Sequence, residues 1–477
     1  MSYFRTSTLP NSPHSAITPE KGSRQKGSEK GSTHGQTLVR PWVDPDQVAP
    51  IGYPIFGLTI VRCPDSLPYI IAIPVNASVR LFFATALSII PLFSATAALN
   101  KLGAMGESYT DEFNLEAGLF MSNWVSQLST FRGIDFGPTA AQAGVGTWGE
   151  PRRLGYKYNW ARSGATSSTL LTQGQHTGCA GQFASNGVSS AVLAIGLNDF
   201  IFTSAAYHAI YSNTWSALQI QTYVSQTVSN IETALVTVRN AGVSVALANI
   251  IDSGLLPGAA GFTNASARDQ VTVVIQTANS RLKDLAQKYQ VPLVDWYGLM
   301  TTILGPNTNP HATLKVGNVT MNLRGIDSGS THTNAFIDGA HPNTVIQGLF
   351  ANLFLQSFVS GYGATNALFS EQEILSHAGI AYGGSDTLQS QIGAYSDYIF
   401  LPAPPKFTSI TVAGTNVTLN FSTASNQLYL VERSDDLNVG LWATLATNFP
   451  GNGGITALTT NVPFGSPKGF YRVRQLP

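Results

Sequence analysis

Residues 189–199 read SSAVLAIGLND, a short apolar run that ends in polar residues. Three further runs of this kind occur, at 101–108, 243–250 and 291–296. Between them, residues 220–240 and 265–289 carry apolar side chains near the 3.6-residue spacing of an amphipathic helix. Short strands that alternate with helices are typical of a parallel sheet covered by helices, and we predict this arrangement for residues 99–400.

The polar residues that follow the predicted strands indicate where chemistry is expected. In an open parallel sheet the carboxyl ends of the strands form the ligand crevice, and the polar clusters of this chain stand at those ends. Residues 305–336 read as a long loop, within which VGNVTMNL at 316–323 predicts a small hairpin. A helix is predicted at 343–359.

The last part of the chain has a different pattern. After LPAPPKF at 401–407 the sequence changes to Thr, Asn, Val and Gly with period-two alternation, as in SITVAGTNVTLNF at 409–421. Alternation of this kind is typical of strands with one buried face. We predict a small β-rich, sandwich-like accessory domain at 403–477, behind a linker that contains a Pro pair.

The beginning of the chain also differs from the centre. Residues 1–74 are rich in Pro, Ser, Lys and Gly without a helical or strand period, which predicts a disordered segment or a wrongly assigned start. Residues 75–98 combine one positive charge, an apolar run and an A-x-A spacing at Ala95 and Ala97, which is typical of a secretory signal peptide. The alternative is a membrane anchor, but the run is shorter than the roughly 20 residues of a span and contains Pro91. We expect export to the periplasm or the extracellular space and no stable membrane span after cleavage.

The composition argues against several classes of partner. Lys+Arg and Asp+Glu number 26 each, and charged residues make up 11% of the chain, against roughly a quarter in typical soluble domains. A charge-poor, balanced surface lacks the basic stripe that nucleic acid requires, so no nucleic-acid partner is expected. Cys63 and Cys179 lack flanking ligands at zinc spacing, and Cys179 reads as a small buried hydrophobe.

Two motifs supply the residue types of nucleophilic catalysis. Ser108, in GES at 106–108, follows the first predicted strand, where its hydroxyl is free to attack an acyl carbon; the alternative is a serine that caps the next helix. DGAHP at 338–342 places a carboxylate three residues before an imidazole. Asp338 can therefore hold one tautomer of His341 while the other ring nitrogen takes a proton.

Two further motifs supply candidate oxyanion donors. In NWARSGAT at 159–166, Gly164 can bring its backbone N–H close to a ligand oxygen, and the alternative is a simple turn glycine. In GLND at 196–199, Asn198 places an amide donor at the end of a core strand. A capping or Asx-turn role is the alternative for Asn198.

Together and in this order, the four motifs resemble the SGNH hydrolase superfamily, also called the GDSL lipase and acylhydrolase family, over roughly residues 99–365. The resemblance implies a three-layer α/β/α, flavodoxin-like parallel sheet. One departure is Glu107, which stands where the family signature usually has Asp, and its extra methylene leaves the serine in place while changing the turn. The chain has no G-x-S-x-G motif, which argues against the α/β-hydrolase alternative.

The same resemblance implies a role for each candidate residue. Ser108 corresponds to the nucleophile, His341 to the general base and Asp338 to the acid that orients it. Ser108, Gly164 and Asn198 correspond to the donors of the oxyanion hole. The implied reaction is ester hydrolysis through an acyl-enzyme, and it requires neither a metal nor an organic cofactor.

Other residues near the motifs receive weaker interpretations. His332 reads as a loop histidine, with a metal site as the alternative. Glu371 and Glu373 fit a solvated helix start. Six aromatic residues read either as core or as the lining of a sugar or acyl site: Trp148, Trp160, Phe200, Phe202, Tyr207 and Tyr211.

We expect a secreted serine ester hydrolase that acts on a small-molecule, lipid or acetylated-carbohydrate ester. Because no Arg/Lys cluster flanks the motifs beyond Arg152, Arg153 and Arg162, we expect the ester to be neutral or hydrophobic. The alternative is a non-catalytic carbohydrate- or surface-binding protein that uses the β-domain on an inactive scaffold. The intact set of serine, histidine and aspartate argues against it. The motifs leave the acyl length and the oligomeric state open.

Overall fold

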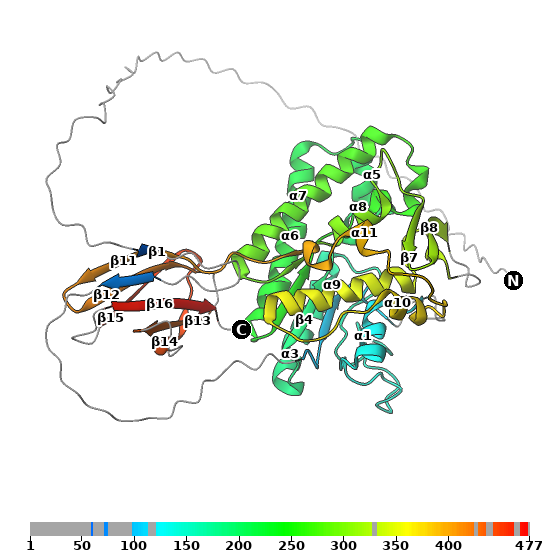
Figure 1. Cartoon of the computed structure of the whole chain (residues 1–477). Coiled ribbons are helices and arrows are strands. Elements are labelled where there is room, and N and C mark those ends of the chain that lie inside the picture. The colour runs from blue at the N-terminus through cyan, green and yellow to red at the C-terminus, as the bar shows by residue number, and fades with distance from the viewer. Residues whose placement is uncertain are drawn as a thin grey trace, which may run out of the picture. The chain divides into compact units, whose positions relative to one another are not determined.

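The computed structural model describes most of the chain from residue 98 onward (Figure 1). The described residues are 59–60, 71–74, 98–112, 121–326, 332–423, 428–435, 442–461 and 468–475. The predicted signal peptide at 75–98, apart from its last residue, and most of the segment 1–74 lie outside them. Within the described ranges, no helix has the length and apolar content needed to cross a membrane.

The predicted apolar runs form a five-stranded sheet in the order β10-β6-β5-β4-β3. Its parallel strands are β3 (Gly103–Gly106), β4 (Ser190–Ala194), β5 (Ser244–Ala248) and β6 (Leu293–Val294). One edge strand, β10 (Ile399–Phe400), runs antiparallel to β6. At the other edge, isolated parallel bridges join Lys101 to Asp135 and Ala104 to Asn159, so irregular chain continues the sheet beyond β3. The predicted parallel sheet is confirmed, with one antiparallel edge.

Alternate residues of each strand enter two separate cores, which establishes three layers. In β4, Val192 and Ala194 join one core cluster, whereas Ala191 and Leu193 join the other. The helices of the first core are α1 (Trp124–Arg132), α8 (Trp296–Leu304) and α9 (Thr344–Tyr362). Those of the second are α2 (Ser167–Thr172), α3 (Gln175–Asn186), α6 (Ala217–Asn240) and α7 (Ala265–Tyr289). The predicted three-layer α/β/α fold is confirmed (Figure 1).

Capping residues set where the long helices begin. A capping box of Ser216 and Gln219 starts α6, Asn264 caps α7, and Asn343 caps α9. Each cap side chain accepts a backbone N–H that has no partner inside the helix. The three predicted helices therefore exist, with α6 beginning and α9 ending slightly beyond the predicted bounds.

A small three-stranded sheet lies in the predicted long loop. Strands β7 (Thr313–Val316) and β8 (Val319–Ile326) pair as the predicted hairpin, and β9 (Asn334–Phe336) pairs in parallel with β8. The remaining short helices are α4 (Leu197–Phe200), α5 (Ala205–Tyr211), η2 (Ser253–Leu255), η3 (Pro257–Gly261), α10 (Glu371–His377), α11 (Gln389–Ile392) and η4 (Tyr395–Tyr398).

The C-terminal residues form antiparallel β-structure, as predicted. The strands are β11 (Phe407–Ala413), β12 (Asn416–Ser422), β13 (Leu428–Ser434), β14 (Ala443–Pro450), β15 (Ile455–Asn461) and β16 (Lys468–Gln475). One sheet contains β11-β12-β15, and the other contains β16-β13-β14. Their shared core includes Leu419 and Phe421 from the first sheet and Tyr429 and Val431 from the second, so the two sheets pack as a sandwich.

Two upstream strands extend the second sheet. Strand β2 (Ile71–Pro74) pairs antiparallel with β16, and β1 (Thr59–Ile60) pairs with β2. These six residues form strands although the sequence of 1–74 shows no strand period. The physical reason is that a sheet edge binds an extended segment through backbone groups, for which no alternation of side chains is required.

Candidate active site

The turn after β3, residues 106–112, is named here the β3 turn, and it carries Ser108. The N–H groups of Thr110 and Asp111 both donate to the carbonyl of Glu107 at 2.9 Å. Gly106 has no room for a side chain, because a Cβ there would collide with the carbonyl oxygen of Ala194 in β4. Close packing against the neighbouring strand therefore fixes where the turn begins.

Ser108, His341 and Asp338 form one hydrogen-bonded chain. Ser108 Oγ lies 2.8 Å from His341 Nε2, and His341 Nδ1 lies 2.7 Å from Asp338 Oδ2. With the Nδ1 proton directed at the carboxylate, Nε2 is the nitrogen that accepts from the serine hydroxyl. Ser108 and His341 are 233 positions apart in the sequence, whereas Asp338 and His341 are three positions apart. The structure brings all three residues together.

The backbone around Asp338 holds its carboxylate in place. Asp338 Oδ1 accepts the N–H groups of Ala340 and His341, each at 2.7 Å. Burial raises the pKa of Asp338, but the hydrogen bonds from the His341 ring and from these two N–H groups outweigh burial and lower the pKa to about 2. The group is therefore a carboxylate at neutral pH.

Tyr109 connects the β3 turn to the loop that carries His341. Its side chain is buried, its hydroxyl donates to the carbonyl of Ala340, and its ring lies 5.9 Å from the His341 imidazole between centroids. Sequence reasoning assigned no role to Tyr109, because a tyrosine next to a serine carries no signal of a contact 231 positions away.

Gly164 lies in the loop of residues 160–166, named here the Gly164 loop, which is attached to the β3 turn at two points. The N–H of Arg162 donates to the carbonyl of Gly106 at 3.0 Å, and the N–H of Ser163 donates to Asp111 Oδ2 at 2.7 Å. Gly164 itself has φ of 79° and is exposed, with open space around the position of a Cβ. The positive φ favours glycine at this position, and the absence of a side chain leaves the backbone exposed.

Asn198 follows β4 at the start of α4. Its Nδ2 donates to the carbonyl of Ala165 at 3.0 Å, which ties it to the Gly164 loop. An amide group has two N–H donors, so one of them remains for a ligand. Gly196, with φ of 124°, makes the sharp bend that turns Asn198 away from the strand.

A pair of buried carboxyl groups lies next to the nucleophile candidate. The side chains of Glu107 and Asp199 are 1% and 3% exposed. Asp199 accepts the N–H and the hydroxyl of Ser167, each at 2.8 Å, whereas Glu107 Oε2 has no hydrogen-bond partner among the described residues. Burial first, and then the charge of Asp199, raises the pKa of Glu107 well above its usual value.

The flanking aromatic residues divide between core and surface. Phe200 and Tyr207 are fully buried in the second core, so for them the core interpretation is confirmed. Phe202 is half-buried and packs against Gly258, whose N–H donates to the carbonyl of Gly339 in the His341 loop. Phe202 therefore packs beside the loop that carries Asp338 and His341.

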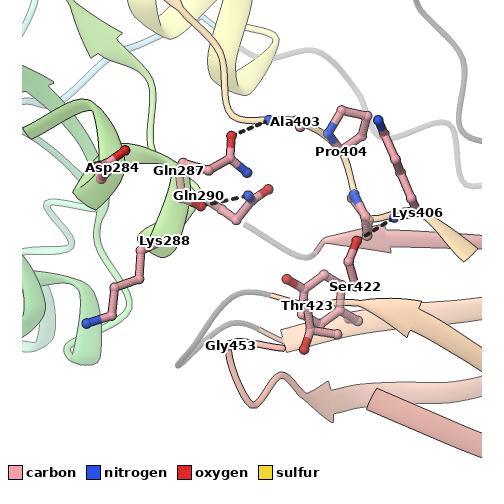
Figure 2. A pocket seen from close by; sticks show the side chains of 12 residues that line it. Asp284, Gln287, Lys288, Gln290, Ala403, Pro404, Lys406, Ser422, Thr423 and Gly453 are labelled. Atoms are coloured by element: carbon pink, nitrogen blue, oxygen red, sulfur yellow. Dashed lines mark hydrogen bonds between the residues drawn. The ribbon is translucent and has the colours of Figure 1, made fainter. Parts of the chain in front are cut away.

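A pocket of about 380 Å³ lies at the C-terminal end of α7 (Figure 2). Its lining includes Gln287, whose Oε1 accepts the N–H of Ala403 at 2.8 Å, and Ser422, whose Oγ accepts the N–H of Lys406 at 2.8 Å. The lining contains none of the predicted site residues. The cluster around Ser108 remains the candidate active site.

Several solved structures are distantly similar to this chain. A putative acylhydrolase from Bacteroides fragilis is 18% identical, with 56% of this chain and 92% of that chain covered and a TM-score of 0.30. A lipase/acylhydrolase from Enterococcus faecalis is 15% identical, with 56% of this chain and 100% of that chain covered and a TM-score of 0.29. An acetylxylan esterase from Geobacillus stearothermophilus is 12% identical, with 57% of this chain and 97% of that chain covered and a TM-score of 0.31. No curated protein sequence matches the chain.

The sequence of the chain also matches a protein family. The sequence model of the GDSL-like lipase/acylhydrolase family matches residues 102–354, which is more than half of the chain and contains every predicted site residue. The resemblance inferred from the four motifs is thereby confirmed. The chain belongs to the GDSL-like lipase/acylhydrolase family.

Proposed function

We propose that this protein hydrolyses carboxylic esters with Ser108 as the nucleophile, His341 as the general base and Asp338 as the acid that orients the base. The observation that carries the proposal is the unbroken hydrogen-bonded chain, with 2.8 Å between Ser108 Oγ and His341 Nε2 and 2.7 Å between His341 Nδ1 and Asp338 Oδ2. These are the contacts that an activated serine requires.

The reaction follows from these contacts. His341 Nε2 takes the proton of Ser108 as Oγ attacks the ester carbonyl carbon, and the carbonyl π electrons move to the oxygen. The tetrahedral intermediate collapses when the protonated imidazole gives its proton to the leaving alcohol. Water, deprotonated by the same nitrogen, then attacks the acyl-enzyme and releases the acid and free Ser108.

Asp338 stabilises the imidazolium that forms in both steps. Its pKa of about 2 means that it remains a carboxylate while the imidazole gains and loses a proton. The side chain is still half exposed, at 49%, so water can take over part of its role when it is removed.

The oxyanion donors in this proposal are the N–H groups of Ser108 and Gly164 and the amide of Asn198. The hydrogen bonds of the Gly164 loop to the β3 turn and of Asn198 to Ala165 support this grouping. Glu107 is consistent with it, because its raised pKa favours the neutral carboxyl group, which places no negative charge beside the oxyanion.

The charges near the site favour a neutral ester. Arg153 pairs with Asp111 at 2.8 Å, and Arg162 pairs with Glu150 at 2.7 Å. Both arginines are neutralised by acids, so neither offers an unpaired charge to a phosphate or sulfate group.

The first prediction concerns the three reacting side chains. Ser108→Ala and His341→Ala should each lower kcat for p-nitrophenyl butyrate by about 10⁴- to 10⁶-fold, and the double variant should be little worse, because the residues act as one unit. Asp338→Ala should retain more activity. Labelling with a fluorophosphonate followed by peptide mapping should modify Ser108, and Ser225→Ala, an exposed serine on α6, serves as the control. Full activity in Ser108→Ala, or a label on another serine, contradicts the mechanism.

The second prediction concerns the C-terminal domain. Removal of residues 403–477 should leave kcat for a small soluble ester close to that of the full chain, because each proposed site residue precedes residue 403. Circular dichroism checks that the truncated protein is folded. A folded truncated protein without activity would place part of the site in the removed domain.

The third prediction concerns the proposed leader at 75–98. Protein exported by its native host should begin near Ala98 or Leu99, because the small residues at Ala95 and Ala97 place the cleavage there. N-terminal sequencing of the exported protein identifies its first residue. Cleavage also removes β1 and β2, so exported protein that retains them contradicts the leader.

The fourth prediction concerns the buried acid Glu107. Its pKa is raised in the folded state, so above about pH 4.5 the unfolded chain releases a proton that the folded chain keeps, and wild-type stability falls as pH rises. As the pH rises above about 4.5, Glu107→Gln should therefore gain free energy of unfolding relative to wild type, as measured by urea denaturation.

The control for this measurement is Glu232. Burial raises the pKa of Glu232, but the hydrogen bonds from Lys288 and Tyr289 outweigh burial and lower the pKa below its usual value. Glu232→Gln should therefore lose stability relative to wild type as pH rises toward neutrality, with the opposite sign. A pH-independent difference for Glu107→Gln shows that Glu107 is not a buried neutral acid.

A further inference from the structure

We infer that Asp111 is a positioning residue that holds the Gly164 loop in place for oxyanion binding. The inference rests on the proposed function and extends it to a side chain that does not touch the reacting atoms. The side chain of Asp111 is 4% exposed, and its Oδ2 accepts both the N–H of Ser163 at 2.7 Å and Nη2 of Arg153 at 2.8 Å.

Asp111 is rigidly connected to the nucleophile. Its N–H donates to the carbonyl of Glu107 at 2.9 Å, so Asp111 is held one turn beyond the residue that precedes Ser108. A movement of the Asp111 backbone relative to Ser108 would break this turn. The hydrogen bond from Ser163 to Asp111 therefore fixes the position of the Gly164 loop relative to the backbone that carries the nucleophile.

The Gly164 loop needs such an anchor. Gly164 is exposed and has φ of 79°, and a glycine in this region has little steric restraint of its own. Residue 163 is the last one before Gly164 that is tied to the β3 turn, and its hydroxyl has no hydrogen-bond partner among the described residues. Together with the hydrogen bond from the N–H of Arg162 to the carbonyl of Gly106, the N–H of Ser163 therefore fixes the orientation of the next peptide, whose N–H is the proposed donor.

Arg153 brings a second loop to the same carboxylate. Its own backbone has φ of 52°, and the N–H of Trp148 donates to its carbonyl at 2.7 Å. The guanidinium is 22% exposed and compensates the charge of Asp111. Asp111 therefore carries two separable contacts, one to the Ser163 N–H and one to the Arg153 side chain.

These two contacts predict different consequences. The oxyanion exists only in the transition state and the tetrahedral intermediate, so loss of the Ser163 contact should lower kcat and leave KM nearly unchanged. Loss of the Arg153 contact alone leaves the Gly164 loop anchored. It should affect stability more than the rate.

The experiment compares four variants of the full chain with p-nitrophenyl butyrate as substrate. Asp111→Ala should lower kcat by about 10²-fold, the effect of a misplacement of about 1 Å at the reacting centre, with a proportionate fall in the rate of fluorophosphonate labelling. Asp111→Asn has the same shape and should show a smaller loss. Arg153→Met should keep kcat near the wild-type value.

The fourth variant is the matched control Glu371→Ala. Glu371 is also a buried carboxylate that accepts backbone N–H groups, from Thr387 and Leu388, but it is remote from the β3 turn. Thermal unfolding establishes for each variant that the folded fraction is being assayed. Glu371→Ala should lower stability without lowering the kcat of the folded protein.

The outcomes separate the two proposals. Wild-type kcat in folded Asp111→Ala and Asp111→Asn, or a loss confined to KM, overturns the positioning role. An equal loss of kcat in Arg153→Met also overturns it, because the ion pair and not the Ser163 contact would then be responsible. Activity that persists in Ser108→Ala overturns the proposed function itself, whereas a strict requirement for Ser108 together with fully active Asp111 variants overturns only this inference.

Discussion

Hydrogen bonds from one short turn hold the candidate site together. Within residues 107–111, the Tyr109 hydroxyl donates to the loop that carries His341, and the Asp111 carboxylate accepts from the Gly164 loop. Gly106, just before them, packs against the backbone of β4. Three segments that are distant in the sequence are thus aligned on a single piece of backbone, and the geometry of the candidate site depends on that turn.

The sheet explains why the turn can take this role. Parallel strands all end at one edge, so the loops after β3 and β4 emerge side by side without long connections. The loop of His341 comes from the other part of the chain and is closed at its base, where Ile337 N–H donates to the carbonyl of His341 and Asn343 N–H donates to that of Ala335, at 2.9 and 2.8 Å. Short, closed loops on a rigid sheet give the fixed distances that proton transfer requires.

Local patterns in the sequence predicted the fold and the contact between Asp338 and His341. The apolar run at 189–199 and the helical period at 265–289 correspond to β4 and α7, because a buried strand and an amphipathic helix each need a spacing that is visible along the chain. The spacing of Asp338 and His341 likewise reflects a contact within one loop, and the structure contains that contact.

Contacts between distant segments could not be predicted in this way. Glu371 was expected to be solvated at a helix start, yet it is 7% exposed and accepts N–H groups from the chain around residue 387. The carboxylate is tolerated because these donors replace water, and no periodicity in the sequence reports them. The same holds for β2, which pairs with β16 through backbone groups alone, and for Asp111, whose partners lie 42 and 52 positions away.

The antiparallel strand β10 has a consequence for how such a protein is assembled from modules. Because the order is β10-β6-β5-β4-β3, the chain leaves the sheet at the edge opposite to the one that carries Ser108. Four strand spacings of roughly 4.8 Å separate these edges by about 19 Å. Residues joined after Phe400 therefore begin about 19 Å from the edge that carries Ser108, so a segment added after this strand starts away from the loops that follow β3 and β4.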